Sequence, residues 1–329
     1  MAHTETLTFA DQVRAIPEGE HVETCYACGT CVSTCMIQQK GEPQYNPRRL
    51  LRMVMMDMRE EAFKSPTTWL CSACDLCYEA CPQEIHISGV IGAVKQLALG
   101  AGYTSPLETV TVDESLCSGC GICVMVCPYD APTLVEKAVD GQMDSVSEVD
   151  ANKCMGCGIC VAACPLGAIA RPGVSNAEIV AQIPLGRDLT TVEGPKLVTF
   201  VCDWCLRADS DVALLESYPE NVRVIHIPCT GRIDPEMALR ALRSGIDGVL
   251  VCGCAPGECH YKRGTYVSSC KIGLLGRMLD QMSAHAGFGS GRVRFVQIGT
   301  QERGRIRAEV DSMLAYLESI VMPVREAGS

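Results

Sequence analysis

The sequence repeats one pattern at Cys117-Ser-Gly-Cys120-Gly-Ile-Cys123-Val-Met-Val-Cys127-Pro128 and at Cys154-Met-Gly-Cys157-Gly-Ile-Cys160-Val-Ala-Ala-Cys164-Pro165. Both runs have the spacing C-x₂-C-x₂-C-x₃-C-P, which is typical of proteins with two [4Fe–4S] clusters. In such pairs the fourth cysteine of each run ligates the other cluster. The predicted ligands of the first cluster are Cys117, Cys120, Cys123 and Cys164. Those of the second cluster are Cys154, Cys157, Cys160 and Cys127.

Glycines lie between these cysteines at Gly119, Gly121, Gly156 and Gly158, where a flexible backbone can curl around an inorganic core. A structural zinc site also uses four cysteines, but it takes two separated pairs and not a run of four that occurs twice. The segment resembles the bacterial two-cluster ferredoxins, and the resemblance implies an α+β fold. We expect this ferredoxin domain to cover residues 106–190.

A second pair of cysteine runs precedes it, at residues 25–35 and 71–81. The same spacing predicts two further [4Fe–4S] clusters with exchanged fourth ligands. One set is Cys25, Cys28, Cys31 and Cys81, and the other is Cys71, Cys74, Cys77 and Cys35. Between the runs, residues 46–56 are predicted to form a helix with Pro47 in its first turn, and residues 85–99 a second helix. We therefore expect an α-helical ferredoxin domain over residues 1–105.

This helical part resembles the C-type subunit of heterodisulfide reductase. The resemblance rests on the run from Cys25 to Cys35, on Tyr45-Asn-Pro-Arg48, and on Trp69-Leu-Cys71-Ser-Ala-Cys74-Asp-Leu-Cys77-Tyr-Glu-Ala-Cys81-Pro82. One departure is Met36, which stands where the run usually continues with proline. The following ferredoxin, together with a short amphipathic helix predicted at 176–183, resembles a section of the A-type subunit of the same reductase.

From residue 191 onward, apolar runs alternate with helical patterns. Strands are predicted at 197–201, 222–227, 248–251 and 293–298, and helices at 209–217, 234–244, 266–285 and 301–319. This alternation is typical of an α/β domain with a parallel sheet covered on both faces. The predicted fold is thus multidomain: an α-helical ferredoxin domain, an α+β ferredoxin domain and a C-terminal α/β parallel-sheet domain at 191–329.

Most remaining cysteines follow the predicted strands, so they should meet beyond the carboxyl ends of the sheet. The candidate ligands are Cys202, Cys205, Cys229, Cys254 and Cys259, of which a [2Fe–2S] cluster needs four. A zinc site and a redox dithiol at Cys202 and Cys205 are the alternatives. Cys252 is expected to face the core and Cys270 to be buried in a helix.

Three basic side chains lie close in sequence to these cysteines. His260 is expected to form hydrogen bonds or lie at the surface and not to ligate iron. Arg232 and Lys262 either balance cluster charge or are solvated, and we favour solvation.

This domain resembles the delta subunit of methyl-viologen-reducing hydrogenase. The resemblance rests on Cys202-Asp-Trp-Cys205, Tyr218-Pro-Glu-Asn-Val-Arg-Val-Ile225, Pro228-Cys-Thr-Gly-Arg-Ile-Asp-Pro235 and Gly253-Cys-Ala-Pro-Gly-Glu-Cys-His-Tyr261. It implies a [2Fe–2S] cluster and a position between a hydrogenase or formate dehydrogenase and a flavoprotein resembling the A-type subunit of heterodisulfide reductase.

Composition narrows the function further. The 329 residues include 23 cysteines, and their clustering indicates metal binding in a reducing compartment, so we expect a cytoplasmic protein. A formal net charge of −11 disfavours nucleic-acid binding. We expect neither a signal peptide nor a membrane span. No Gly-x-Gly-x-x-Gly follows a strand, there is no P-loop, and no nucleophile-and-base pattern marks a catalytic site.

The sequence thus predicts an iron–sulfur electron-transfer subunit of a large hetero-oligomer, with four [4Fe–4S] clusters and one [2Fe–2S] cluster. The resemblances imply a flavin-based electron-bifurcating complex. The alternatives are a tungsten-dependent aromatic acyl-CoA reductase complex, a heterodisulfide-type terminal reductase and a zinc scaffold. The catalytic Cys-Cys-Gly motifs of the reductase are missing from the sequence, which disfavours the terminal reductase.

Overall fold

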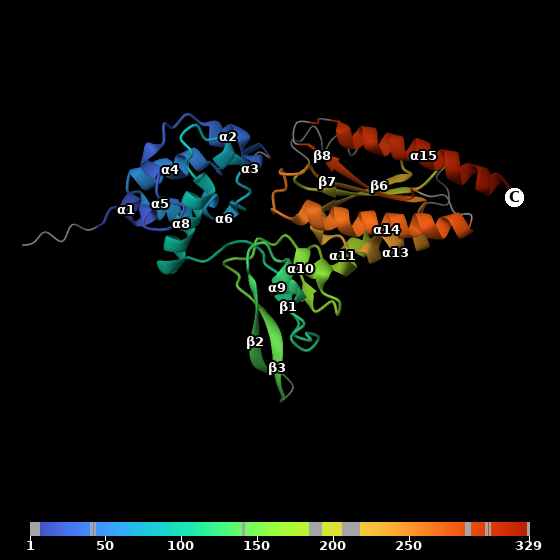
Figure 1. Cartoon of the computed structure of the whole chain (residues 1–329), viewed down its shortest axis with the longest axis horizontal. Helices are drawn as coiled ribbons and strands as arrows, with labels where there is room; N and C mark the ends of the chain where they lie inside the picture. The colour runs from blue at the N-terminus through green and yellow to red at the C-terminus, as the bar shows by residue number, and fades with distance from the viewer. Residues whose placement is uncertain are drawn as a thin grey trace, which may run out of the picture. The chain divides into compact units, whose positions relative to one another are not determined.

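We describe the protein from a computed structural model. The structure describes residues 7–39, 42, 44–139, 142–183, 193–205, 218–286, 291–299, 302 and 304–327. The chain divides into two compact units, residues 1–107 and residues 108–329 (Figure 1). Among the described residues, no helix has both the length and the apolar composition needed to cross a membrane.

The first unit is helical. Its elements are α1 (Phe9–Arg14), η1 (Val22–Thr24), α2 (Thr30–Thr34), α3 (Met36–Gln39), α4 (Pro47–Met55), α5 (Arg59–Lys64), α6 (Pro66–Leu70), α7 (Leu76–Glu79) and α8 (Ile87–Gly100). The predicted helices at 46–56 and 85–99 are confirmed as α4 and α8. Helix α4 begins as the sequence indicates, because the Asn46 side chain accepts a hydrogen bond from the Arg49 N–H and Pro47 occupies the first turn.

One core holds this unit together. It is formed by the apolar faces of α1, α4 and α8, with Phe9, Leu50 and Val90 each 1% exposed or less. The cysteine-bearing helices α2 and α7 contact each other and close over this core. The longer helices therefore form the scaffold, and the short cysteine helices are supported by it.

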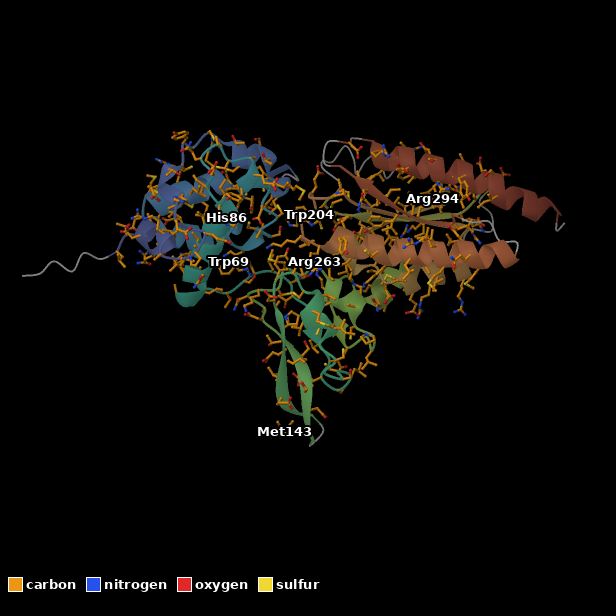
Figure 2. All side chains as sticks on the ribbon, in the orientation of Figure 1. Trp69, His86, Met143, Trp204, Arg263 and Arg294 are labelled. Atoms are coloured by element: carbon orange, nitrogen blue, oxygen red, sulfur yellow. The ribbon has the colours of Figure 1, made fainter. Side chains whose placement is uncertain are left out.

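The second unit begins with the ferredoxin part. Its elements are β1 (Thr111–Val112), α9 (Ile122–Val126), β2 (Pro132–Val139), β3 (Gln142–Val149), α10 (Ile159–Ala163), β4 (Ile169–Ala170) and α11 (Asn176–Ala181). Strand β1 pairs with β4, and β2 pairs with β3, both antiparallel. Strands β2 and β3, in a stretch that carries no predicted element, thus form an antiparallel ribbon with Met143 close to its far end (Figure 2).

The rest of this unit is a four-stranded parallel sheet. Its elements are β5 (Leu197–Cys202), β6 (Val222–Ile227), η2 (Thr230–Arg232), α13 (Pro235–Arg243), β7 (Gly248–Cys254), α14 (Gly264–Ala286), β8 (Val293–Ile298) and α15 (Arg305–Ala327). The four predicted strands and the parallel pairing are confirmed. The helix predicted at 209–217 lies outside the described residues.

The strand order is β6-β5-β7-β8, so the chain adds β6 on one side of β5 and then crosses to add β7 on the other side. In open parallel sheets, ligands bind beyond the carboxyl ends of the strands at the point where the order switches sides in this way. Helices α13 and α14 cover one face of the sheet and α15 covers the other (Figure 1). Ile179 of α11 and Ile183, both from the ferredoxin part, lie in the core under α13 and α14, which ties the ferredoxin to the sheet.

Candidate metal centres

The four cysteine runs share one backbone conformation. The residue before the second cysteine and the residue after it both have positive φ in every run. The first position is Ala27 (55°), Ala73 (50°), Gly119 (63°) and Gly156 (63°), and the second is Gly29 (91°), Asp75 (65°), Gly121 (72°) and Gly158 (78°). Two left-handed residues turn backbone N–H groups inward, as anion-binding loops do. The Ala27 N–H and the Gly156 N–H accordingly lie 3.4 Å from the Sγ atoms of Cys25 and Cys154.

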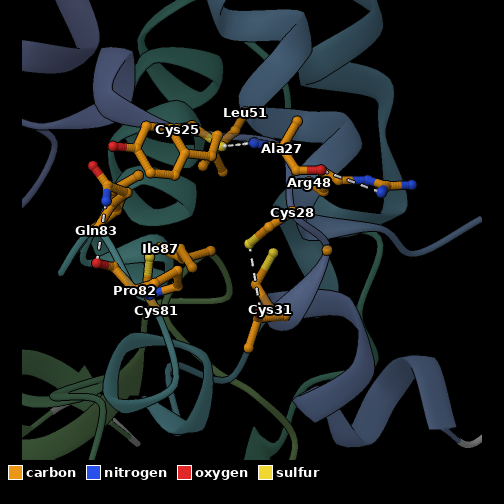
Figure 3. Close-up of a pocket in the computed structure, with 14 residues that line it drawn as sticks. Cys25, Ala27, Cys28, Cys31, Arg48, Leu51, Cys81, Pro82, Gln83 and Ile87 are labelled. Carbon is orange, nitrogen blue, oxygen red and sulfur yellow. Dashed lines mark hydrogen bonds between the residues drawn. The ribbon is translucent and has the colours of Figure 1, made fainter.

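The first predicted ligand set surrounds one cavity (Figure 3). Cys25, Cys28 and Cys31 come from one run, and Cys81 comes from the end of the other. The cavity has about 350 Å³ of empty volume and is otherwise lined mainly by apolar groups. Burial, together with nearby thiolates that include that of Cys81, raises the pKa of Cys31 to about 11. The exchanged fourth cysteine therefore lies where the spacing predicts.

The second set, in the same unit, converges around Cys77. Burial raises the pKa of Cys77, and the neighbouring thiols of Cys71, Cys74 and Cys35 add to the effect. The hydroxyl of Tyr45, which is 2% exposed, donates a hydrogen bond to the Cys71 sulfur. Tyr45 lies in the stretch that resembles the C-type reductase subunit, but sequence patterning alone gives no sign of this contact.

The two ferredoxin sets are assembled in the same way. Four cysteines line a cavity with about 360 Å³ of empty volume, namely Cys117, Cys120, Cys123 and Cys164. Burial is the main reason that the pKa of Cys160 in the other set is raised, and the negative charge of the nearby Cys157, Cys154 and Cys127 thiolates contributes to the same rise. Thiolates brought this close together repel one another unless a cation balances them. This arrangement fits the four thiolates that a [4Fe–4S] cluster requires.

The C-terminal thiols meet at the predicted sheet edge. Cys202 ends β5, Cys254 ends β7, and Cys205 follows β5 by one turn. The Cys254 Sγ lies 3.9 Å from the Cys202 Sγ and 3.8 Å from the Cys205 Sγ. All three thiols are buried and lie within 4.8 Å of one another. A tetrahedral metal–sulfur site with bonds of about 2.3 Å has sulfurs about 3.8 Å apart.

Cys259 and Cys229 extend this group. Cys259 forms hydrogen bonds with Cys229 and Cys254, which lower the pKa of Cys259 to about 2 and raise the pKa of Cys229. The Thr265 N–H at the start of α14 lies 3.5 Å from the Cys259 Sγ. A side chain at Gly264 would meet the Cys229 sulfur, so only glycine fits there.

One buried hydroxyl beside these thiols, the Oγ1 atom of Thr230 directly after Cys229, has no hydrogen-bond partner among the described residues. The Thr265 hydroxyl, near the start of α14, donates to the Cys259 sulfur. Buried hydroxyls are normally satisfied, so Thr230 fits a site that supplies a further acceptor. The sulfides of a [2Fe–2S] cluster are such acceptors, and five buried thiols exceed the four that one zinc ion binds. The residues thus fit the group that the sequence predicts.

Two expectations about single residues are wrong. Cys270 is exposed on α14 and not buried, and Arg232 is fully buried and not solvated. For His260 only the surface alternative is wrong, because the ring is 3% exposed and stacks on Trp204 with ring centroids 3.3 Å apart. Tertiary packing and not local sequence pattern decides the burial of these side chains.

Cys252 is buried in the core, as expected, although it shares a strand face with Cys254 because the two residues lie two positions apart on the strand. Burial raises its pKa, with the charge of Glu309 on α15 as the second cause. Cys252 thus lies farther from the carboxyl end of β7 than Cys254 does. Lys262 is exposed, with its Nζ 5.8 Å from the ring of Tyr129.

The ferredoxin and the sheet edge meet in one buried apolar cluster. Its members are Cys157, Ile159, Cys229 and Tyr261, with Trp204 packed against them. Figure 2 places Trp204 at the end of the sheet. A predicted ligand of a ferredoxin cluster therefore shares its packing with a thiol of the C-terminal group.

Arg232 fixes this contact. Its Nε and Nη2 atoms donate to the carbonyl oxygen of Val174 at 3.0 and 2.8 Å, and Nη2 donates to the Asn176 side chain at 2.7 Å. A Cβ added at Gly158, the residue after Cys157, would lie 2.5 Å from the Arg232 Cδ. Arg232, which lies just after Cys229 in the sequence, thus packs its side chain against the loop that carries Cys157.

Replacing Gly158 by alanine is expected to destabilise this junction. Its φ of 78° costs a side chain about 1–2 kcal/mol, and the overlap with Arg232 adds to that cost. Gly167→Ala is the matched control, because Gly167 has a φ of 66° and nothing within 4 Å of an added Cβ. Thermal loss of cluster absorbance should come several degrees lower in Gly158→Ala than in Gly167→Ala. Equal shifts would show that the Arg232 contact contributes nothing.

Comparison with known proteins agrees with this arrangement. Residues 197–320 match the family described as methyl-viologen-reducing hydrogenase, delta subunit. Residues 21–85, 70–131 and 116–168 match 4Fe–4S dicluster domains. The sheet domain and the cysteine runs are therefore recognised independently of each other.

Three curated relatives cover different parts of the chain. The D-type iron-sulfur subunit of the F420-non-reducing hydrogenase of Archaeoglobus profundus is 42% identical over 27% of this chain and 66% of its own length. The A-type subunit of the ferredoxin/F(420)H(2)-dependent CoB-CoM heterodisulfide reductase of Methanosarcina acetivorans is 34% identical over 44% of this chain and 18% of its own length. The C-type subunit of the H(2):CoB-CoM heterodisulfide,ferredoxin reductase of Methanothermobacter marburgensis is 30% identical over 30% of this chain and 51% of its own length.

The chain spans less than two thirds of the length of each of these three relatives. The comparisons nevertheless confirm the resemblances to the A-type and C-type subunits of heterodisulfide reductase and to the hydrogenase. Through residues 197–320 the chain belongs to the family of the methyl-viologen-reducing hydrogenase delta subunit, and ahead of that part it carries 4Fe–4S dicluster ferredoxin domains.

Proposed function

We propose that this chain is a non-catalytic electron-transfer subunit that holds four [4Fe–4S] clusters and one [2Fe–2S] cluster. The four exchanged cysteine sets hold the [4Fe–4S] clusters, two in residues 1–105 and two in residues 106–190. Four of the five thiols at the sheet edge hold the [2Fe–2S] cluster. Bound clusters supply one-electron redox chemistry, and the chain's own residues position them and tune their potentials.

One observation carries the relay: the buried cluster of Cys157, Ile159, Cys229 and Tyr261. It excludes water between a ferredoxin loop and the C-terminal thiols, and Arg232 keeps the two elements in register. A rigid, dry contact favours transfer because little solvent has to reorganise. The Lys271 ammonium adds a second tie across the same contact, to the Ala162 carbonyl oxygen at 3.4 Å.

The partners follow from the relatives. Because the chain resembles the A-type and C-type subunits of heterodisulfide reductase and the D-type subunit of a hydrogenase, we propose a hetero-oligomer. In it the chain connects a flavoprotein resembling the A-type reductase subunit with a hydrogenase, formate dehydrogenase or other redox enzyme. Flavin-based electron bifurcation belongs to the same proposal, as does a cytoplasmic location, where free thiols stay reduced.

The test uses the purified, cluster-loaded chain under anaerobic conditions. We expect it to pass electrons from dithionite to redox dyes and to turn over no metabolite. Reduction of a heterodisulfide by the chain alone would show a terminal reductase instead. A chain that binds iron but passes no electrons to any dye would contradict a relay.

A further inference from the structure

One exposed face of α4 combines arginines with methionines. Arg48, Arg49 and Arg52 are exposed, and Met55 and Met56 are 38% and 62% exposed. At about 100° per residue these five positions span about 120° of the helix circumference. The opposite side of α4 contributes Leu50 and Leu51 to the core. The arginines and methionines thus form one outward face.

Two of the three charges on this face do not stabilise the helix. Helix N-termini favour acidic side chains, yet the first turn of α4 has Arg48 and Arg49 and no acid, whereas Arg52 lies in the last turn, where a cation is favourable. Among the described residues, none of the three arginines forms an ion pair within 4.0 Å. These three exposed arginines thus make the face locally positive on a chain whose formal net charge is −11.

The same face borders the cavity of the first cysteine set. Arg48 lines that cavity, and its Nη1 donates to the Ala27 carbonyl oxygen at 3.4 Å (Figure 3). On the same loop, Cys28 is exposed and Tyr26 is 73% exposed. A cluster on this loop would therefore have an edge near solvent, immediately beside the arginines.

We propose that Tyr26, Arg48, Arg49, Arg52, Met55 and Met56 form a docking surface for an acidic redox protein. Arginine, methionine and tyrosine are enriched at protein interfaces, and methionine adapts to varied partners. The positive charge selects a partner with an acidic face and steers it to the exposed cluster edge. This inference rests on the proposed function, since it treats the cysteine set as an electron exit or entry.

The test measures electron transfer from the dithionite-reduced, cluster-loaded chain to two forms of cytochrome c by stopped flow. Native cytochrome c is basic, and succinylated cytochrome c is acidic with the same haem. The variant is Arg49→Glu with Arg52→Glu, neither of which lines the cavity. The matched control, Arg240→Glu with Arg243→Glu, reverses two exposed charges on α13.

With succinylated cytochrome c at low salt, we expect Arg49→Glu/Arg52→Glu to transfer electrons at least about tenfold more slowly than the parent. The control variant should retain the parent rate, and the difference should vanish near 1 M salt, where charges are screened beyond about 3 Å. With native cytochrome c the same variant should not be slower. Equal iron content of all variants excludes cluster loss as the cause.

Equal rates for parent, variant and control with succinylated cytochrome c would overturn the docking surface and leave the relay intact. A loss of the same size with both cytochromes would also overturn it, because the effect would not depend on charge. Transfer to neither cytochrome by any variant, the parent included, would instead contradict the proposed function and the surface with it.

Discussion

Replacing Cys254 by alanine is expected to abolish the C-terminal cluster, with a loss of about two iron atoms per chain. Cys254 lies closest to the centre of the five clustered cysteines, in contact with Cys202, Cys205 and Cys259. The four thiols that remain then lack the sulfur that contacts three of them. The [2Fe–2S] signal in the EPR spectrum of the reduced chain should disappear, and the cubane signals should remain.

Cys252→Ala is the matched control on the same strand. Cys252 is buried beside α15 and is not one of the three thiols that lie within 4.8 Å of one another, so its substitution should retain iron content and the EPR spectrum. Cys270→Ala, on the exposed face of α14, controls for the loss of any one thiol. If Cys252→Ala removed the [2Fe–2S] signal and Cys254→Ala did not, the assignment of ligands at the sheet edge would be wrong.

Replacing Arg232 by glutamine is expected to make one ferredoxin cluster harder to reduce. Burial lowers the pKa of Arg232 to about 10, so the guanidinium stays charged at neutral pH, and it lies near the Cys160 thiol. Loss of a positive charge beside a cluster disfavours the added electron. The reduction potential should become more negative, on the order of 50 mV for about 1 kcal/mol of lost interaction.

The side chain also holds Val174 and Asn176, so its loss has a structural effect as well. Arg232→Lys separates the two effects, because lysine keeps the charge and loses the planar fork. We expect both variants to lower the temperature of cluster loss, and only Arg232→Gln to shift the potential in an EPR-monitored redox titration. A shift of equal size in Arg232→Lys would mean that packing and not charge sets the potential.

Sequence reasoning predicts much of this structure because the cysteine spacing is a strong constraint. Cys81 and Cys164, the predicted fourth ligands, line the cavities of the partner runs. The four strands of the sheet are likewise marked by apolar runs between helical patterns. Both signals are local, and both are read from a short stretch of chain.

The remainder depends on contacts between distant segments. Ala27 and Ala73 take the left-handed conformation that glycine has in the other two runs, because the surrounding fold offsets its cost of about 1–2 kcal/mol. The burial of Arg232 depends on Val174, 58 positions away. The antiparallel ribbon of β2 and β3 has mixed polarity, so its strands show no clear alternation.

Iron and acid-labile sulfide analysis of the anaerobically purified chain, with EPR of the reduced protein, tests the five-cluster relay most directly. We expect about 18 iron atoms per chain and signals of both the cubane and the [2Fe–2S] type. About 16 iron atoms without the [2Fe–2S] signal would contradict it, since the thiols at the sheet edge would then hold zinc or act as a dithiol.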